Sequence, residues 1–125
     1  MNYGFIPQTL GQDGDPLDIL VICSQSIQPL CLVEATVIGN MQMIDQGERD
    51  DKIIAVASND PTVKHIKDID ELPEHFFHEL KHYFEEYKVL ENKVVEIDNF
   101  QNKDEAYRII DEAIEFYKDK YRDKL

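Results

Sequence analysis

Apolar and polar residues alternate with different periods in the two halves of the chain. In the first half, short apolar runs are separated by turn-forming residues, a pattern typical of strands. We expect strands over residues 17–22, 30–38 and 52–57. Gly39 and Asn40 should end the second strand, and residues 41–44 should continue the sheet into an acidic loop. The first half therefore predicts a sheet of closely spaced strands.

In the second half, apolar residues recur at spacings of three and four, which marks one face of a helix. This pattern predicts a helix from Pro73 to about Leu90, followed by a short strand over residues 93–97. Asn102 with Glu105 three positions later predicts the N-terminal cap of a second helix that runs nearly to the end. The fold class is therefore α+β, a mostly antiparallel sheet or barrel with helices packed against it. The second helix should bury Ala106, Ile109, Ile110, Ala113, Ile114 and Tyr117.

The length of 125 residues suits one domain spanning 1–125, and 42% of the residues are hydrophobic, enough for a modest core. No run of about 20 apolar residues predicts a membrane span. The first residues lack the basic and apolar regions of a signal peptide, so we expect a cytoplasmic protein. Cys23 and Cys31 have neither CxxC nor zinc spacing, which favours reduced, partly buried thiols over a hairpin disulfide.

The net charge is strongly negative. The chain has 13 basic and 26 acidic residues, giving 13 − 26 = −13. Such a charge repels nucleic acids and anionic membranes, so neither is an expected partner. If the substrate is an anion, bound metal ions must offset this charge.

Asp13, Asp15 and Asp18 gather three carboxylates in the segment 13–18, among a glycine and a proline. A solvated turn is one explanation, because Asp, Gly and Pro are common in turns. Asp18, however, lies inside an apolar run and shares a strand face with Leu20, which makes a purely solvated role awkward. Carboxylate oxygens are the ligands that Mg²⁺ prefers, and the ligand ladder of a calcium EF-hand is absent. This segment is thus a candidate Mg²⁺ site.

A second acidic run contains Asp45, Glu48, Asp50 and Asp51, and Lys52 follows it directly. Charged hairpin loops are ordinary, so the run alone is a weak signal. Lys52, however, opens a strand and would place a cation beside the acidic residues. Carboxylates with interspersed cations point to chemistry on a phosphate.

Two groups on the predicted first helix carry weaker signals. Tyr87 and Lys88 lie at its end, where a lysine interacts favourably with the helix dipole without any further function. His75, His78 and His82 are spaced by three and four, which suits a metal-binding face, but a surface or subunit-contact role is favoured.

The segment Asp13-Gly14-Asp15-Pro16-Leu17-Asp18-Ile19 resembles the signature of the soluble family I inorganic pyrophosphatases. The resemblance continues in order along nearly the whole chain. It includes the Tyr-Gly strand at residues 2–7, the second acidic loop at 43–52, and the segments 65–73 and 83–88. It implies a small, mostly antiparallel, OB-like β-barrel flanked by two α-helices.

The resemblance also assigns roles to single residues. Asp13, Asp18 and Asp50 are similar to the ligands of the tightest Mg²⁺, with Asp18 shared with a second ion. Asp15 resembles the residue that accepts a proton from the attacking water, which two metal ions would activate. The remaining assignments are Asp45 as a ligand of further Mg²⁺ ions, and Tyr3, Lys52, Tyr87 and Lys88 as substrate-binding residues.

The implied function is Mg²⁺-dependent hydrolysis of pyrophosphate to two phosphates, by a homo-oligomer that is a hexamer in bacterial relatives. Two departures from the family pattern qualify it. Gln46 stands where the family often has glutamate, and the family ordinarily has several tens of residues before the strand that holds Tyr3. We therefore expect an N-terminally incomplete barrel with impaired activity. The alternatives are an inactive metal-binding or assembly remnant of this fold, or a regulatory partner of a full-length copy.

Overall fold

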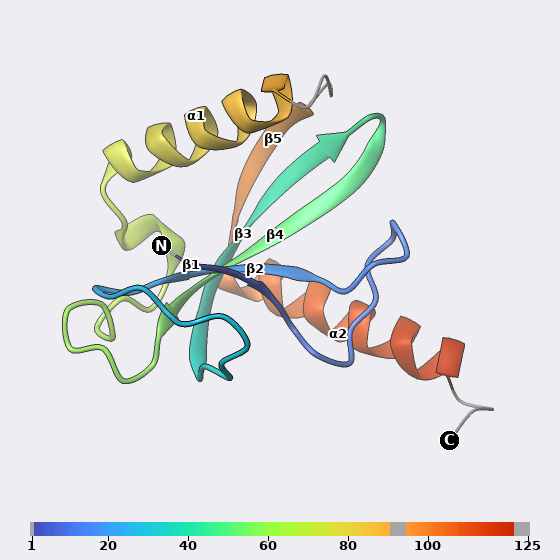
Figure 1. Ribbon diagram of the computed structural model, residues 1–125, viewed down its shortest axis with the longest axis horizontal. Coiled ribbons are helices and arrows are strands. Elements are labelled where there is room, and N and C mark those ends of the chain that lie inside the picture. The colour runs from blue at the N-terminus through green and yellow to red at the C-terminus, as the bar shows by residue number, and fades with distance from the viewer. Residues whose placement is uncertain (1, 91–94, 122–125) are drawn as a thin grey trace.

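The structure is a computed structural model that describes residues 2–90 and 95–121. Within these ranges, the side chains of residues 45, 87–90 and 95–98 are not described. Strands dominate the first half and helices the second, as the two periods predicted (Figure 1). None of the helices in these ranges is long and apolar enough to cross a bilayer. The elements are β1 (Asn2–Phe5), β2 (Asp18–Ile22), β3 (Ala35–Asp45), β4 (Glu48–Ala57), the 3-10 turn η1 (Ile69–Glu71), α1 (Glu74–Leu90), β5 (Val95–Asn102) and α2 (Lys103–Tyr121).

The strands form one open sheet in the order β1-β2-β4-β3-β5. Three neighbouring pairs are antiparallel, and β2 and β4 are parallel. The predicted α+β class and the mostly antiparallel pairing are confirmed, and within the described residues the sheet does not close into a barrel. The parallel pair places Asp18 directly opposite Lys52, so two segments far apart in the sequence meet at the centre of the sheet.

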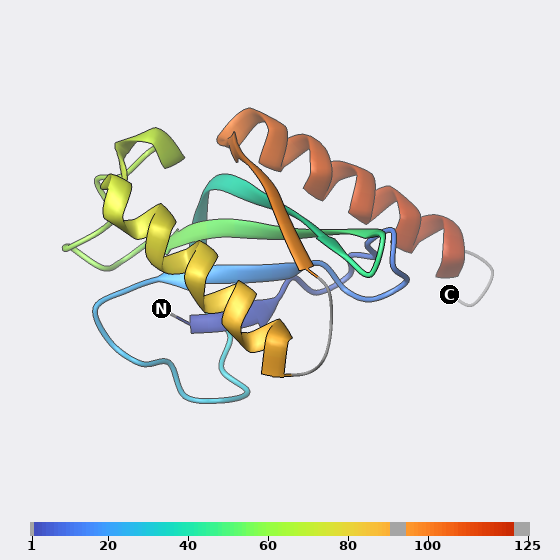
Figure 2. The same cartoon turned by 90° about the horizontal axis from the view of Figure 1, so that it is seen from above.

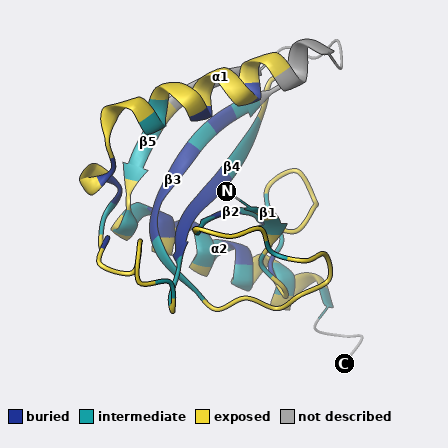
Figure 3. Cartoon of the chain, turned by 60° about the vertical axis from the view of Figure 1, so that its left-hand side comes forward, coloured by how far each residue is buried: buried dark blue, intermediate teal, exposed yellow. Residues whose placement is uncertain are grey.

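The two helices cover opposite faces of the sheet (Figure 2). On one face, Leu80 and Phe84 of α1 pack on Ile54 of β4. On the other face, Ile109 of α2 packs on Ile53, the neighbouring residue of the same strand. Successive side chains of a strand point to opposite faces, so β4 serves two cores. Figure 3 shows its buried middle, with β3, between the largely exposed outer surfaces of the helices.

The second predicted strand is wrong in both of its limits. It begins at Ala35 rather than at Leu30, because Leu30 has a positive φ of 67° that breaks the extended backbone. Residues 30–34 therefore form an exposed loop, and Cys31 in it is a free, exposed thiol rather than a partly buried one. Cys23 is a free, half-buried thiol.

The strand also continues through Gly39 and Asn40 instead of ending there. Gly39 allows an unusually close approach, since a Cβ at this position would lie 2.7 Å from both Gln101 O and Ile69 Cβ. Glycine here is a packing requirement rather than a turn signal.

The helices match the predictions more closely. The first helix begins at Glu74, directly after Pro73. The cap of α2 is confirmed, because Asn102 Oδ1 accepts a hydrogen bond from Glu105 N at 3.1 Å. The strand predicted over residues 93–97 falls partly outside the described residues, and β5 extends beyond it to Asn102.

Candidate active site

The loop that carries Asp13 and Asp15 is held by backbone hydrogen bonds at both of its ends. Leu10 N donates to Ala113 O of α2 at 3.0 Å, and Gly11 N donates to Asp15 O at 2.7 Å. Gly14 has a φ of 85°, a conformation in which glycine avoids the strain of a side chain. The loop therefore turns back sharply and delivers the chain into β2 at Asp18.

Lys52 is the centre of the site. Its side chain is only 5% exposed, and Nζ donates to Asp18 Oδ2 at 2.5 Å and to both carboxylate oxygens of Asp50 at 2.9 Å. Asp50 reaches Lys52 because the two residues lie on the same face of β4, two positions apart. Asp18 reaches it through the parallel pairing of β2 with β4. One ammonium group thus joins two of the predicted metal ligands.

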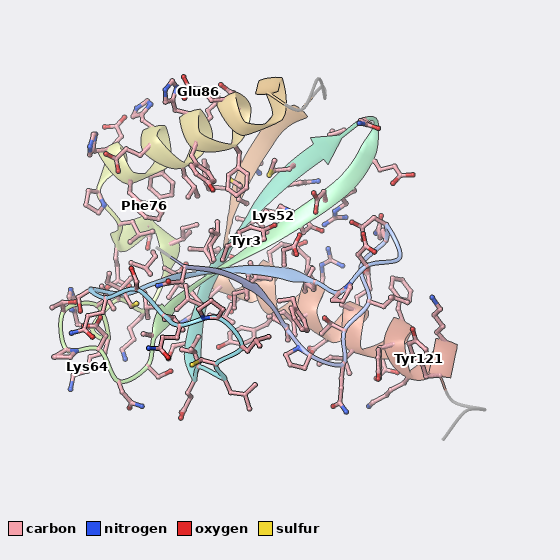
Figure 4. All side chains as sticks on the ribbon, viewed as in Figure 1. Tyr3, Lys52, Lys64, Phe76, Glu86 and Tyr121 are labelled. Atoms are coloured by element: carbon pink, nitrogen blue, oxygen red, sulfur yellow. The ribbon has the colours of Figure 1, made fainter. Side chains whose placement is uncertain are left out.

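Tyr3 lies over this ion cluster, as the two neighbouring labels in Figure 4 show. Its ring centroid is 5.6 Å from Lys52 Nζ and 6.3 Å from the ring of Phe84 in α1. Tyr3 is 54% exposed, and the partial burial of its hydroxyl, only partly offset by Lys52, raises its pKa to about 12. The hydroxyl therefore stays protonated near neutral pH and can act as a hydrogen-bond donor.

The electrostatics of the cluster reflect burial together with the close charges of Lys52 and the carboxylates. Burial raises the pKa of Asp50 above its usual value, Lys52 opposes this shift, and the charges of Asp18 and Asp13 add to it. For Lys52, burial lowers the pKa, but hydrogen bonds to Asp18, Tyr3 and Asp50 outweigh burial and hold it above its usual value. Lys52 is thus a cation at neutral pH, and the carboxylates still repel one another.

A hollow beside the cluster brings the third predicted ligand to the same place. Asp13, Asp18 and Asp50 all border it, together with Arg49 and with Phe116 of α2. Within the described part of the chain, no three acidic, histidine or cysteine side chains form a compact metal-binding group. The chemistry of the donor set still suits a hard cation, because it consists of oxygen ligands with unfavourable mutual repulsion.

The other predicted site residues are less closely joined to the cluster. Asp15 is exposed in its turn, and its backbone N–H donates to Asp13 Oδ1 at 3.1 Å. The side chains of Asp45, Tyr87 and Lys88 lie outside the described residues. His75, His78 and His82 are exposed on α1, each beside a glutamate one helical turn away. These residue roles stay predictions.

The sequence reasoning did not identify a buried polar group behind the site. Asn40 of β3 is 0% exposed, and its Nδ2 donates to Asp51 Oδ1 at 3.1 Å. In the sequence, the signal for this buried group is Asn40 itself, a polar residue among apolar ones, and the pattern there predicts the end of a strand.

Comparison with known proteins gives consistent matches along the chain. The family model described as inorganic pyrophosphatase matches residues 1–118. Soluble inorganic pyrophosphatase 2 of Chlamydomonas reinhardtii is 48% identical over 120 residues, covering 96% of this chain and 62% of that protein. The chain spans between 54% and 62% of the length of this protein and the rice soluble inorganic pyrophosphatases.

Solved structures agree with these matches. The inorganic pyrophosphatase of Helicobacter pylori superposes with a TM-score of 0.89 at 43% identity, covering 94% of this chain and 71% of that one. The inorganic pyrophosphatase of Thermus thermophilus also superposes with a TM-score of 0.89, at 39% identity, covering 93% of this chain and 68% of that one. The fold and the sequence therefore point to the same set of relatives.

Proposed function

The chain belongs to the inorganic pyrophosphatase family, and from this membership we propose that it hydrolyses inorganic pyrophosphate to two phosphates. The observation that carries the proposal is the contact of the buried Lys52 ammonium with the half-buried carboxylates of Asp18 and Asp50. Such a site combines acceptors for hard cations with a donor for phosphate oxygens. We also propose a cytoplasmic location and a homo-oligomeric assembly.

We infer that Mg²⁺ is the cofactor and that Asp13, Asp18 and Asp50 hold it, with Asp45 holding further ions. Burial is the main cause that raises the pKa of Asp50, with the charges of Asp18 and Asp13 adding to it, and a bound cation would favour the charged carboxylate. When bound, Mg²⁺ supplies an acidified water and offsets negative charge on the phosphate oxygens.

The side chains of the chain itself perform the remaining steps. Asp15 accepts the proton of the attacking water, a role that its exposed carboxylate leaves open. Lys52 and Tyr3 donate to phosphoryl oxygens, where negative charge increases during the displacement. Tyr87 and Lys88 donate to the same substrate in this proposal.

Phosphate release from pyrophosphate, measured by a malachite-green assay with Mg²⁺, tests this function. Asp15→Asn keeps the size of the side chain and removes its basicity, so we expect a rate at least about 100-fold lower, the usual contribution of a positioned base. Asp111→Asn removes an acidic group from the exposed surface of α2 and should leave the rate unchanged.

Two results would contradict the proposal. Equal loss in both variants would show that Asp15 has no special role. Mg²⁺ binding without any phosphate release would instead support a non-catalytic metal-binding or assembly role for this fold.

A further inference from the structure

The strand β4 carries functional side chains on one face and a polar contact network on the other. Asp50 and Lys52 point toward Asp18, whereas Asp51 between them points to the face that α2 covers. The Asp51 side chain is only 9% exposed. Whatever fixes Asp51 therefore also fixes the backbone from which both site residues project.

Asn40 connects Asp51 to two neighbouring strands. Its Nδ2 donates to Asp51 Oδ1 at 3.1 Å and to Gln101 Oε1 of β5 at 2.8 Å. Arg49 completes the network, with Nε 3.0 Å from Asp51 Oδ2. Three adjacent strands, β4, β3 and β5, are thus joined by side chains beside the site, and Arg49 and Asp51 also border its hollow.

This network incurs an energetic cost that fold stability alone does not explain. Asn40 Oδ1 is buried without a hydrogen-bond partner, and so is Arg49 Nε, whose contact with Asp51 is an ion pair rather than a hydrogen bond. A buried unpaired acceptor is unfavourable, and it partly offsets what the two hydrogen bonds of Asn40 contribute to stability. A buried polar network of this kind fixes the relative placement of the strands that it joins more than it increases the stability of the fold.

The pairing of β3 is irregular on both sides of Asn40. Its register with β4 shifts between Val37 and Gly39, and its register with β5 shifts between Gln42 and Met43. Such irregularities leave residues unpaired and locally disrupt the backbone ladder. The side-chain contacts of Asn40 supply a register lock at the place where β3 pairs with the site segment of β4.

We propose that Asn40 and Asp51 are positioning residues for the site. Through the backbone of residues 50–52, they set the Asp50 carboxylate and the Lys52 ammonium against Asp18. The effect on catalysis rests on the proposed pyrophosphatase function, whereas the effect on cation binding can be measured without it.

The test compares Asn40→Leu, which changes no charge and removes both hydrogen bonds of Asn40, with Asp51→Asn, which keeps side-chain volume but removes the ion pair with Arg49 and one negative charge beside the site. Mn²⁺ serves as the probe, and its affinity is measured by titration calorimetry on the folded protein. We expect both variants to bind Mn²⁺ about 10-fold more weakly, as when the supporting partners of metal ligands are lost. The kcat for pyrophosphate should fall about 10-fold with little change in KM, and the double variant should be no worse than either single one.

Thr36→Val is the matched control. It removes another side-chain hydrogen bond, which joins β3 to the residue after β4 and lies between Thr36 Oγ1 and Ser58 Oγ at 2.9 Å. Thr36 pairs with Val56, six residues along the strand from Asp50, roughly 20 Å away at the usual rise. This control should keep the Mn²⁺ affinity of the wild type.

The outcomes separate the two proposals. Mn²⁺ affinity within twofold of wild type in folded Asn40→Leu, the variant that changes no charge, overturns the positioning role, as does equal weakening in Thr36→Val. A wild type that binds no Mn²⁺ also overturns it. A wild type that binds Mn²⁺ but releases no phosphate contradicts the pyrophosphatase function, while the affinities still test the positioning role.

Discussion

At the residue scale, Lys52 has two relations to the candidate site. Its ammonium lies between Asp18 and Asp50, where it partly offsets the repulsion between two carboxylates that we assign to Mg²⁺. A divalent cation that takes the same oxygens must compete with this ammonium. Lys52 therefore acts as an internal counter-ion in the cation-free protein, in addition to its proposed contact with substrate.

Replacement of this lysine should have opposite effects on cation binding and on catalysis. Lys52→Met removes the competing charge, so we expect tighter Mg²⁺ binding by calorimetry, together with a phosphate-release rate about 100-fold lower. Without Mg²⁺, the variant leaves two close carboxylates unpaired and should lose about 2 kcal/mol of unfolding free energy in urea. Added Mg²⁺ should restore much of this loss.

Lys64→Met is the control for this experiment, because Lys64 is exposed and lies far from Lys52 in Figure 4. It removes the same charge and should change neither cation affinity nor rate. Weaker Mg²⁺ binding in Lys52→Met would contradict the counter-ion role.

At the element scale, sequence patterns located the helices and most strands but misplaced features that depend on tertiary contact. The helix period and the Asn102 cap are local properties, and both were predicted correctly. The local sequence predicts a strand end at Gly39, because a glycine there is typical of a turn. Its real role, a close approach to Ile69 and Gln101, depends on residues some 30 and 60 positions away. Strand limits set by such distant contacts cannot be obtained from local patterns.

Gly39→Ala tests this explanation of the strand. The added Cβ would lie 2.7 Å from a backbone oxygen of β5 and from Ile69 Cβ, so the sheet or η1 must shift. We expect a loss of about 1–3 kcal/mol in unfolding free energy, typical of overpacking, measured by urea denaturation. Gly4→Ala is the matched control in β1, where a Cβ meets nothing within 4 Å. Equal stability of the two variants would contradict the packing account.

The same distinction applies to the candidate site. The two acidic segments were recognisable separately because each is a short motif. Their junction depends on the parallel pairing of β2 with β4, which neither motif encodes. Asn40 was missed for a related reason, because its partners Asp51 and Gln101 lie on two other strands.

At the scale of the whole molecule, the net charge of −13 shapes the proposed reaction. Pyrophosphate is itself an anion, and five carboxylates border the hollow at the candidate site, those of Asp13, Asp18, Asp50, Asp51 and Glu112. Binding of this substrate is therefore unfavourable unless divalent cations screen the site. The account predicts that substrate affinity and turnover both depend on Mg²⁺.

The most direct measurement is the initial rate of phosphate release from pyrophosphate across a Mg²⁺ titration, for the intact chain and for Asp50→Asn. We expect release that requires Mg²⁺, and a rate in Asp50→Asn that is about 10²–10³-fold lower at saturating Mg²⁺. No Mg²⁺-dependent release by the intact chain, or an equal rate in Asp50→Asn, would contradict this expectation.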